Sequence, residues 1–243
     1  MTNVTFKGLN SFLPLLLFLS QLLFSVFIFN SYSFYTFEFQ KHNIYHEFSE
    51  SPQTINQQAL SIIYYLRGQI DSLDAVFFSE RARIHMQDVK TIFIWMQWLL
   101  YVTGFLSFIS FFHLIYQKKI KELGKQLIWS GFLSIGFVLV ISLIAFTFWD
   151  WAFVAFHHLM FTNDYWLLDP SDNLIKMMPA EFFQDMVRWI GLGIVGLGIV
   201  NMVIGWYILK FCELYVTFGA VSKHYEGDQH GPKTKKENSP GGR

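Results

Sequence analysis

Four long hydrophobic stretches separated by polar segments dominate this chain. They cover residues 8–34, 91–116, 127–149 and 189–209. A bilayer core about 30 Å thick is crossed by about 20 apolar residues in a helix, and each stretch reaches that length. The pattern therefore predicts four transmembrane helices. The first follows a short lysine-bearing start, as in a signal peptide, but its length and its lack of a small-residue cleavage site favour a retained helix.

The charges of the connecting segments predict an orientation. Residues 117–126 form a short turn that carries four lysines. Because Lys and Arg are concentrated in cytoplasmic loops, we expect this turn in the cytoplasm. Both termini then lie on the cytoplasmic side, and residues 35–90 and 150–188 form two extracytoplasmic loops. Residues 210–243 are expected to be a cytoplasmic tail, disordered from about residue 225, where the chain becomes polar and rich in Gly and Pro.

The first outer loop carries patterns of its own. Apolar and polar residues alternate over residues 35–40, which is typical of a strand, and residues 73–78 have the apolar content of a second strand. Between them, Ser51 and Pro52 can start a helix that Gly68 can end. The chain is therefore predicted to be an α-helical integral membrane protein, with a mixed α/β extracytoplasmic headpiece built from the two outer loops.

Glycine recurs every seven residues in the last hydrophobic stretch, at Gly191, Gly198 and Gly205. Residues seven apart lie on nearly the same face of a helix. Small residues on such a face let two membrane helices approach closely. We expect this face to form a helix–helix contact.

Composition supports the membrane assignment and excludes other classes. Hydrophobic residues make up 53% of the chain and charged residues 15%, against about 25% charged in a typical globular protein. Lys plus Arg and Asp plus Glu are equal at 18 each, so no excess positive charge favours nucleic acid. Cys212 is the only cysteine, which excludes a disulfide framework and cysteine-based metal sites. The chain has no GxSxG, P-loop or dinucleotide motif.

Histidines are the candidate catalytic residues, and the predicted topology sorts them. The second and third hydrophobic stretches form a hairpin, so the residues before 91 and after 149 emerge on the same outer side. If both flanks continue as helix, His85 and His157 lie at similar depth at the outer membrane interface. A single interfacial histidine is most often structural, whereas two at one depth are candidates for proton transfer.

Carboxylates accompany both histidines. Asp88 follows His85 by three residues on one helix face, where it can fix the tautomer of the imidazole and raise its basicity. Asp150 precedes His157 by seven residues, about 10.5 Å along a helix, and is expected to support rather than contact it. His158 points about 100° away from His157 and is interpreted as structural. No HExxH or similar close ligand pair is present, so we predict no metal site at these residues.

Four residues are candidates for a substrate pocket. Arg83 suits a phosphate headgroup or a loop carboxylate, with a structural role as the simpler interpretation. Trp149 and Trp166 are interpreted first as membrane-interface aromatics and second as a wall for the substrate's chains. Phe153, on the same segment, completes the set.

The order and spacing of these features resemble those of one bacterial family, the lipoprotein intramolecular transacylases (Lit), which are integral proteins of the bacterial cell membrane. The resemblance implies that His85 and His157 form the catalytic pair, and it gives no such role to the other histidines. The residues that carry it are the run from His85 to Lys90 before the second stretch, and Trp149, Phe156, His157, Leu159, Phe161 and Trp166 after the third.

The resemblance also implies a reaction. Family members move an acyl chain from the sn-2 ester of the diacylglyceryl group on a lipoprotein's N-terminal cysteine to that cysteine's own α-amine, which gives the lyso-form lipoprotein. An α-amine with a pKa of about 7.7 to 8 must lose a proton before it attacks an ester, and histidine can accept that proton. Both reacting groups sit on one molecule and ester-to-amide transfer is downhill, so no cofactor is expected.

The residues suggest a division of labour. We expect His85, oriented by Asp88, to act as general base, and His157 to stabilise the oxyanion, although exchanged roles fit the sequence equally. The partners are then a diacylated bacterial lipoprotein and membrane lipids, without nucleic acid. The oligomeric state is left open.

Two other functions remain compatible with the same histidines. An interfacial lipid or peptide hydrolase would release a fatty acid or a new terminus, whereas transacylation leaves the mass of the product equal to that of the substrate. A non-catalytic four-span sensor or accessory protein would show no turnover and would tolerate loss of one histidine.

Overall fold

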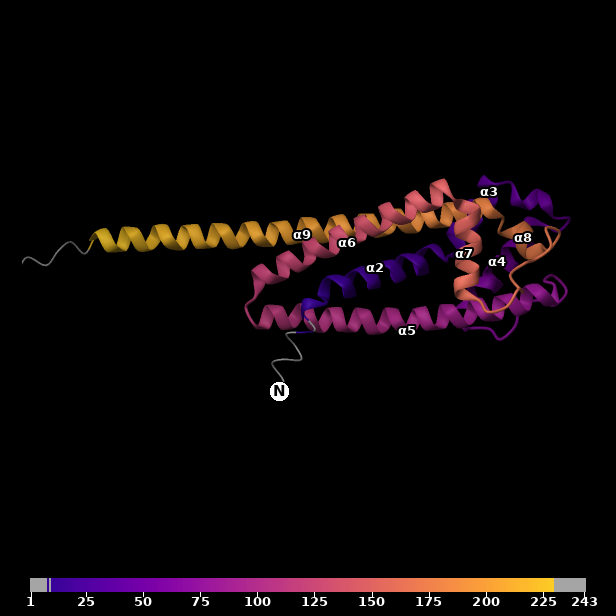
Figure 1. Ribbon diagram of the computed structural model, residues 1–243, viewed down its shortest axis with the longest axis horizontal. Coiled ribbons are helices and arrows are strands. Elements are labelled where there is room, and N and C mark those ends of the chain that lie inside the picture. Colours follow the sequence, from indigo (N-terminus) through magenta and orange to yellow (C-terminus); the bar gives the residue numbers. More distant parts are fainter. Residues whose placement is uncertain (1–7, 9, 230–243) are drawn as a thin grey trace, which may run out of the picture.

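In the computed structural model, the structure describes residues 8 and 10–229, with side chains described up to residue 216. Long helices lie side by side, and short helices gather at one end of the molecule (Figure 1). The described part of the chain contains helices, turns and no strand. In chain order, the elements are α2 (Leu13–Phe29), α3 (Tyr32–Lys41), the 3₁₀ helix η1 (Ile44–Glu47), α4 (Pro52–Leu66), α5 (Glu80–Tyr116), α6 (Ile120–Thr147), α7 (Trp149–Met160), α8 (Asn173–Met177) and α9 (Ala180–Gln229).

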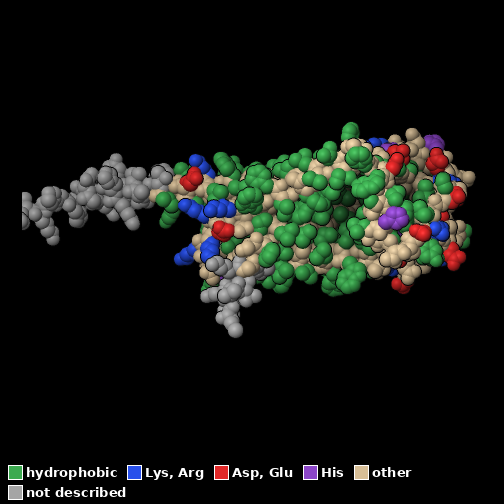
Figure 2. Space-filling view, in the orientation of Figure 1, with side chains coloured by type: hydrophobic (Ala, Val, Ile, Leu, Met, Phe, Trp, Pro, Cys, Tyr) green, Lys and Arg blue, Asp and Glu red, His purple; other side chains and the backbone are tan. Residues whose placement is uncertain are grey.

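Three of the described helices are long and apolar enough to cross a membrane: α5, α6 and the part of α9 over Ala180–Val216. The helices α2 and α3 are bent by 62° against each other and make a fourth, broken span if they are counted together. Figure 2 shows hydrophobic side chains covering the middle of one face, with charged side chains toward its two ends. The predicted multi-pass helical membrane protein is therefore confirmed, with three or four candidate spans in the described residues.

The glycines of the last span lie at a close helix contact, as predicted. A Cβ atom added to Gly205 would stand 2.5 Å from the backbone oxygen of Gly124 on α6, and one added to Gly198 would stand 2.9 Å from the Cβ atom of Ser134. Gly191 is less tightly placed, with 3.3 Å to the nearest side-chain atom. Because side chains are absent at these positions, the backbones of α6 and α9 can touch.

The α/β headpiece that the sequence predicted is wrong, because both expected strands have other structures. Residues 35–40 belong to α3, where Phe39 is 0% exposed and Phe37 is 50% exposed. Buried residues recur there at the spacing of a helix, and a six-residue alternation could not distinguish the two periods. Residues 73–78 are irregular backbone with a turn at residues 75–77, and Asp74 Oδ1 accepts a hydrogen bond from the backbone N–H of Val76 at 2.8 Å. An Asx turn of this kind competes with strand pairing.

The helix predicted between those segments is confirmed as α4. The Ser51 hydroxyl accepts a hydrogen bond from the backbone N–H of Thr54 at 3.2 Å, and Pro52 occupies the first turn. Gly68 follows the end of the helix with φ of 71°, a left-handed conformation that favours glycine.

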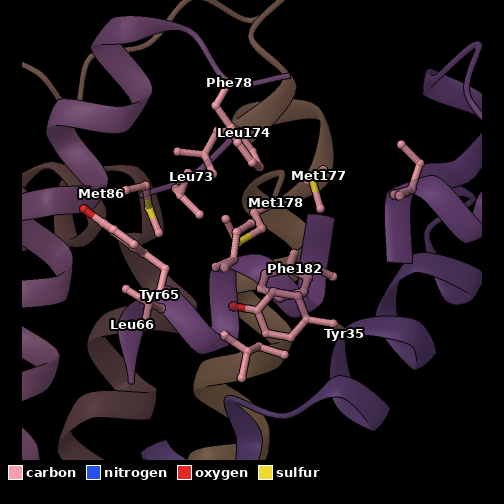
Figure 3. Packing of buried hydrophobic residues seen from close by; sticks show 14 of the residues in the cluster. Tyr35, Tyr65, Leu66, Leu73, Phe78, Met86, Leu174, Met177, Met178 and Phe182 are labelled. Carbon is pink, nitrogen blue, oxygen red and sulfur yellow. The ribbon is translucent and has the colours of Figure 1, made fainter. Parts of the chain in front are cut away.

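A buried hydrophobic core holds the headpiece together (Figure 3). It joins α3, α4 and α8 to the first turns of α5 and α9. The ring of Phe182 at the start of α9 lies 5.0 Å from the ring of Tyr35 and 5.7 Å from that of Phe34. The first residues of α5 and α9 are thereby fixed against the headpiece, which also limits where the side chains on their other faces can lie.

The helix α9 continues to Gln229, well beyond residue 209, where the last hydrophobic stretch ends. Residues 225–229, which were predicted to be disordered, therefore have a helical backbone. The remainder of that prediction lies outside the described residues.

Candidate active site

The helix α5 places His85 in its second turn. Ser79 caps this helix, and its hydroxyl accepts a hydrogen bond from the backbone N–H of Ala82 at 3.1 Å. Met86, the next residue after His85, is packed into the headpiece core. Because neighbours in a helix point about 100° apart, the imidazole of His85 is turned out of that core, and it is 9% exposed.

His157 reaches the same place by a different path from the one that the sequence suggested. The third span does not continue as one helix, because α6 ends at Thr147 and the backbone breaks at Phe148, with φ of −137° and ψ of 47°. The short helix α7 then crosses the end of the bundle toward α5 (Figure 1). The two histidines still meet as predicted, with ring centroids 6.1 Å apart and planes inclined by 34°.

Aromatic rings surround His157. Its ring centroid lies 4.2 Å from that of Phe153, 4.7 Å from that of Trp166 and 5.7 Å from that of Phe161. Phe161 also contacts His85 edge to face at 5.0 Å. The two histidines are therefore buried among aromatic rings where α5, α7 and the following loop meet. This cluster of His85, His157, Phe153, Phe161 and Trp166 is called the histidine pocket below.

One hydrogen bond fixes the tautomer of His157. Its Nδ1–H donates to the backbone oxygen of Phe153, one turn earlier in α7, at 2.7 Å. The neutral ring then carries its lone pair on Nε2. Burial lowers the pKa of His157, an effect that the hydrogen bond to Phe153 partly opposes and the neighbouring His158 reinforces. The imidazole is therefore neutral at pH 7 and can accept a proton at Nε2.

Two buried polar atoms next to this ring have no hydrogen-bond partner among the described residues: Nδ1 of His85 and Nε1 of Trp166. Buried polar groups are nearly always paired in folded proteins, because an unpaired group loses its bonds to water without replacement. Two such atoms on rings that contact His157 mark a place where a polar group of a ligand can bind.

Asp88 does not orient His85 as the sequence suggested. Within the described residues, its carboxylate accepts a hydrogen bond from Asn163 Nδ2 at 2.9 Å and none from His85. Residues three apart in a helix can meet, but the loop after α7 supplies a better-placed donor. Sequence reasoning missed Asn163, since no local pattern shows that a loop 75 positions away returns to α5.

Arg81 fastens the same loop to α5. Its guanidinium donates to the backbone oxygen of Leu167 at 2.9 Å and to that of Asp164. It also lies over the ring of Tyr165, 5.5 Å from its centroid. These contacts hold the loop residue Trp166 against His157, so Arg81 positions a wall of the pocket.

Other residues that the sequence singled out lie on α7. Trp149 and Phe153 lie one turn apart on α7, with ring centroids 6.1 Å apart, and extend the aromatic face that carries His157. Asp150 is exposed on the first turn of α7, and the structure does not bring it to the histidine pair. His158 packs edge to face on Trp166 at 5.3 Å, in agreement with a structural role.

Arg83, a candidate for the substrate pocket, lies on a different face of α5 from His85. It lies two residues before His85, which is about 200° around the helix. There it lines a separate cleft of about 510 Å³ together with Tyr65 and Lys90. Lys90 also donates a hydrogen bond to the backbone oxygen of Ile70 at 2.9 Å.

The fold and the site together define a class: a multi-pass helical membrane protein with a buried histidine pair beneath a helical headpiece. Residues 11–183, more than half of the chain, match the family described as lipoprotein intramolecular transacylase Lit. The chain belongs to this family.

Solved structures agree with the family match. The structure of the membrane-integral lipoprotein intramolecular transacylase Lit from Bacillus cereus is similar, with a TM-score of 0.79 and 27% sequence identity, over 87% of this chain and 99% of that one. A variant of the Bacillus protein with a histidine-to-alanine mutation gives a TM-score of 0.73 at 27% identity, over 88% of this chain and 97% of that one.

A curated relative matches over a shorter stretch. It is an uncharacterized protein of Aquifex aeolicus (strain VF5), 29% identical over 123 residues. The match covers 47% of this chain and half of the length of that relative.

Proposed function

We propose that this protein is an acyltransferase that moves the sn-2 acyl chain of a diacylglyceryl-cysteine lipoprotein to the α-amine of the same cysteine. The product is a lyso-form lipoprotein with an N-acyl group and an S-monoacylglyceryl group. The observation that carries the proposal is the His85–His157 pair, with ring centroids 6.1 Å apart in an aromatic pocket, in a chain of the Lit family.

His157 is assigned as the general base. Its Nδ1–H is committed to the Phe153 carbonyl, so the free lone pair of Nε2 can take a proton from the substrate's amine as nitrogen attacks the ester carbon. The same nitrogen then returns the proton to the glycerol oxygen as the C–O bond breaks. One C–N bond forms and one C–O bond breaks, so the total mass of the lipoprotein is unchanged.

His85 is assigned to the oxyanion. Its Nδ1 has no hydrogen-bond partner among the described residues, so a neutral His85 protonated at this nitrogen has an N–H to offer to the tetrahedral intermediate. A donor held in place in a pocket of low polarity stabilises developing negative charge strongly. This assignment reverses the roles that the sequence suggested, because Asp88 is bonded to Asn163 instead of His85.

The surroundings suit an acylated substrate. Trp149, Phe153 and Trp166 give the pocket an apolar wall, and Figure 2 shows a hollow among hydrophobic side chains close to the headpiece. A lipoprotein anchored in the bilayer by its acyl chains would present its cysteine at this depth. We place the headpiece and the active site at the outer interface of the bacterial cell membrane, with both termini in the cytoplasm, since the lysine-rich turn of residues 117–126 lies at the opposite end.

Mass spectrometry of a synthetic diacylated lipopeptide tests the proposal. After incubation with the purified protein, we expect the total mass to be unchanged and fragmentation to find one acyl chain on the N-terminal nitrogen. Loss of one acyl mass would instead show a lipid hydrolase. An unchanged acyl pattern with a folded protein would contradict both enzymatic functions.

A further inference from the structure

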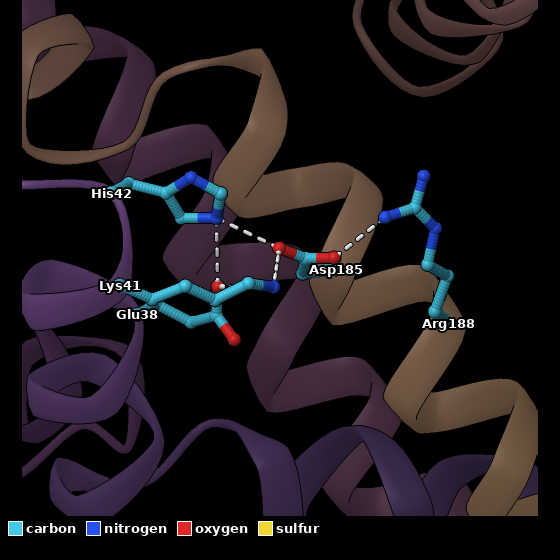
Figure 4. Close-up of polar contacts among 5 residues, drawn as sticks. All are labelled: Glu38, Lys41, His42, Asp185 and Arg188. Atoms are coloured by element: carbon cyan, nitrogen blue, oxygen red, sulfur yellow. Dashed lines mark hydrogen bonds and ion pairs between the residues drawn. The ribbon is translucent and has the colours of Figure 1, made fainter.

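Away from the histidine pair, the end of α3 meets the start of α9 through a cluster of charged side chains (Figure 4). Glu38 and His42 lie one helical turn apart at the end of α3, and Asp185 lies in the second turn of α9. One potential ligand atom from each of these three residues lies within 4.8 Å of the other two. His42 Nε2 is 3.1 Å from Glu38 Oε2 and 2.7 Å from Asp185 Oδ2.

Glu38 is the member that needs an explanation. Its side chain is 0% exposed, and neither carboxylate oxygen accepts a hydrogen bond from any described residue. The cationic groups beside it are His42 Nε2, at 3.1 Å, and Lys41 Nζ, at 3.8 Å, and the Asp185 carboxylate also lies close to it. A buried carboxylate without donors is costly unless a cation or a proton meets it. Its position, aimed at an imidazole and a second carboxylate, is one that a metal cation would satisfy.

We propose that Glu38, His42 and Asp185 form a binding site for one divalent transition-metal ion, with Zn²⁺ as the ion that the donor set fits best. Zn²⁺ binds imidazole nitrogen and carboxylate oxygen at about 2.0 to 2.2 Å in tetrahedral geometry, which separates neighbouring ligand atoms by about 3.4 Å. Small side-chain rotations reach this separation from the observed distances. Ca²⁺ and Mg²⁺ prefer oxygen donors alone, so the imidazole selects against them.

Two basic residues shape this site. Arg188 Nη1 donates to Asp185 Oδ1 at 2.7 Å, which orients the carboxylate and leaves Oδ2 for a metal. Lys41 Nζ contacts that second oxygen and is therefore the competitor of the metal. The Lys41 side chain is 41% exposed, so it can swing into solvent when an ion neutralises the two carboxylates.

A metal here would fasten α3 to α9 and not take part in acyl transfer. Two residues before Asp185, Phe183 contacts Phe153 with ring centroids 6.0 Å apart, and Phe153 in turn contacts His157. The site therefore stabilises the scaffold behind the histidine pocket. Its existence does not depend on the proposed reaction, and it can be tested without a lipoprotein substrate.

Titration of chelator-stripped protein in detergent with Zn²⁺, followed by calorimetry and by elemental analysis after gel filtration, tests the site. We expect one Zn²⁺ per chain, undisturbed by excess Ca²⁺. Glu38→Gln and His42→Gln should each weaken binding by more than the about 10- to 100-fold that the loss of an outer-shell partner costs, since they remove a ligand itself. His46→Gln and Glu47→Gln, which change exposed residues of the adjacent η1, are the matched controls and should bind as the wild type does.

A variant that binds Zn²⁺ more tightly than the wild type is also needed, because misfolding could weaken binding but could not strengthen it. Lys41→Met removes the competing ammonium and should bind Zn²⁺ more tightly than the wild type. His157→Ala should bind Zn²⁺ as the wild type does, because His157 is not a ligand of the proposed site. The proposal is overturned if the wild type binds no stoichiometric Zn²⁺, if Glu38→Gln binds as tightly as the wild type, if Lys41→Met binds more weakly, or if binding is lost in His157→Ala.

Discussion

The side-chain amide of Asn163 donates a hydrogen bond to the carboxylate of Asp88 at 2.9 Å and so ties the loop after α7 to the helix that carries His85. Trp166, which contacts His157, belongs to the same loop. The bond therefore sets the distance between the two halves of the pocket. The sequence suggested that Asp88 orients the imidazole of His85, whereas in the structure its carboxylate holds the loop that carries Trp166.

Asp88→Ala should lower kcat by about 10- to 100-fold, the range expected for loss of a hydrogen bond to a charged group. Asp88→Asn keeps an oxygen that can accept from Asn163 and should restore most of the activity. Asp150→Asn, which alters an exposed carboxylate away from the pair, is the control and should behave as the wild type does. Lipopeptide turnover measures all three, and an Asp88→Asn variant as weak as Asp88→Ala would contradict a positioning role.

His157→Ala should lower kcat by about 10²- to 10⁴-fold, the usual contribution of general acid–base catalysis. His158→Ala offers a matched control, since this neighbouring ring packs on Trp166 and not on His85. We expect it to retain most of the activity. Turnover by folded His157→Ala at the wild-type rate would remove the base assignment.

The acid limb of the pH profile should report His157. Burial lowers its pKa below the ordinary value of about 6.5, so the neutral base persists into mildly acidic solution and is lost only as pH falls through the lowered value. The substrate's α-amine, with a pKa of about 7.7 to 8, is already protonated there. The logarithm of kcat/KM should therefore rise with a slope near one between about pH 6.5 and 7.7, and become steeper only at lower pH, where His157 also takes up a proton. A steeper slope that begins above pH 6.5 would contradict a buried, neutral His157.

The sequence predicted the spans and the meeting of His85 with His157, because length, hydropathy and a short turn determine which helix ends lie together. It could not predict the break at Phe148, the bond between Asn163 and Asp88, or the place of Arg83. Each of these depends on how a loop folds back over distant residues, which no local period records. The expected strands failed for a related reason: the burial of Phe39 in the headpiece core, not the alternation of neighbours, decided the structure of α3.

Close contact between α6 and α9 should make the glycines there sensitive to a single methyl group. In Gly205→Ala, the new Cβ atom would stand 2.5 Å from the Gly124 oxygen and 2.9 Å from Ile128 Cγ1, so the helices must separate. Overpacking of this kind costs about 1 to 3 kcal/mol.

Gly196→Ala is the matched control on the same helix, because nothing lies within 4 Å of its added Cβ atom. Thermal unfolding in detergent should give a lower Tm for Gly205→Ala and an unchanged or slightly higher Tm for Gly196→Ala, since alanine favours helix more than glycine does. Equal Tm values for the two variants would show that the backbones of α6 and α9 do not touch at Gly205.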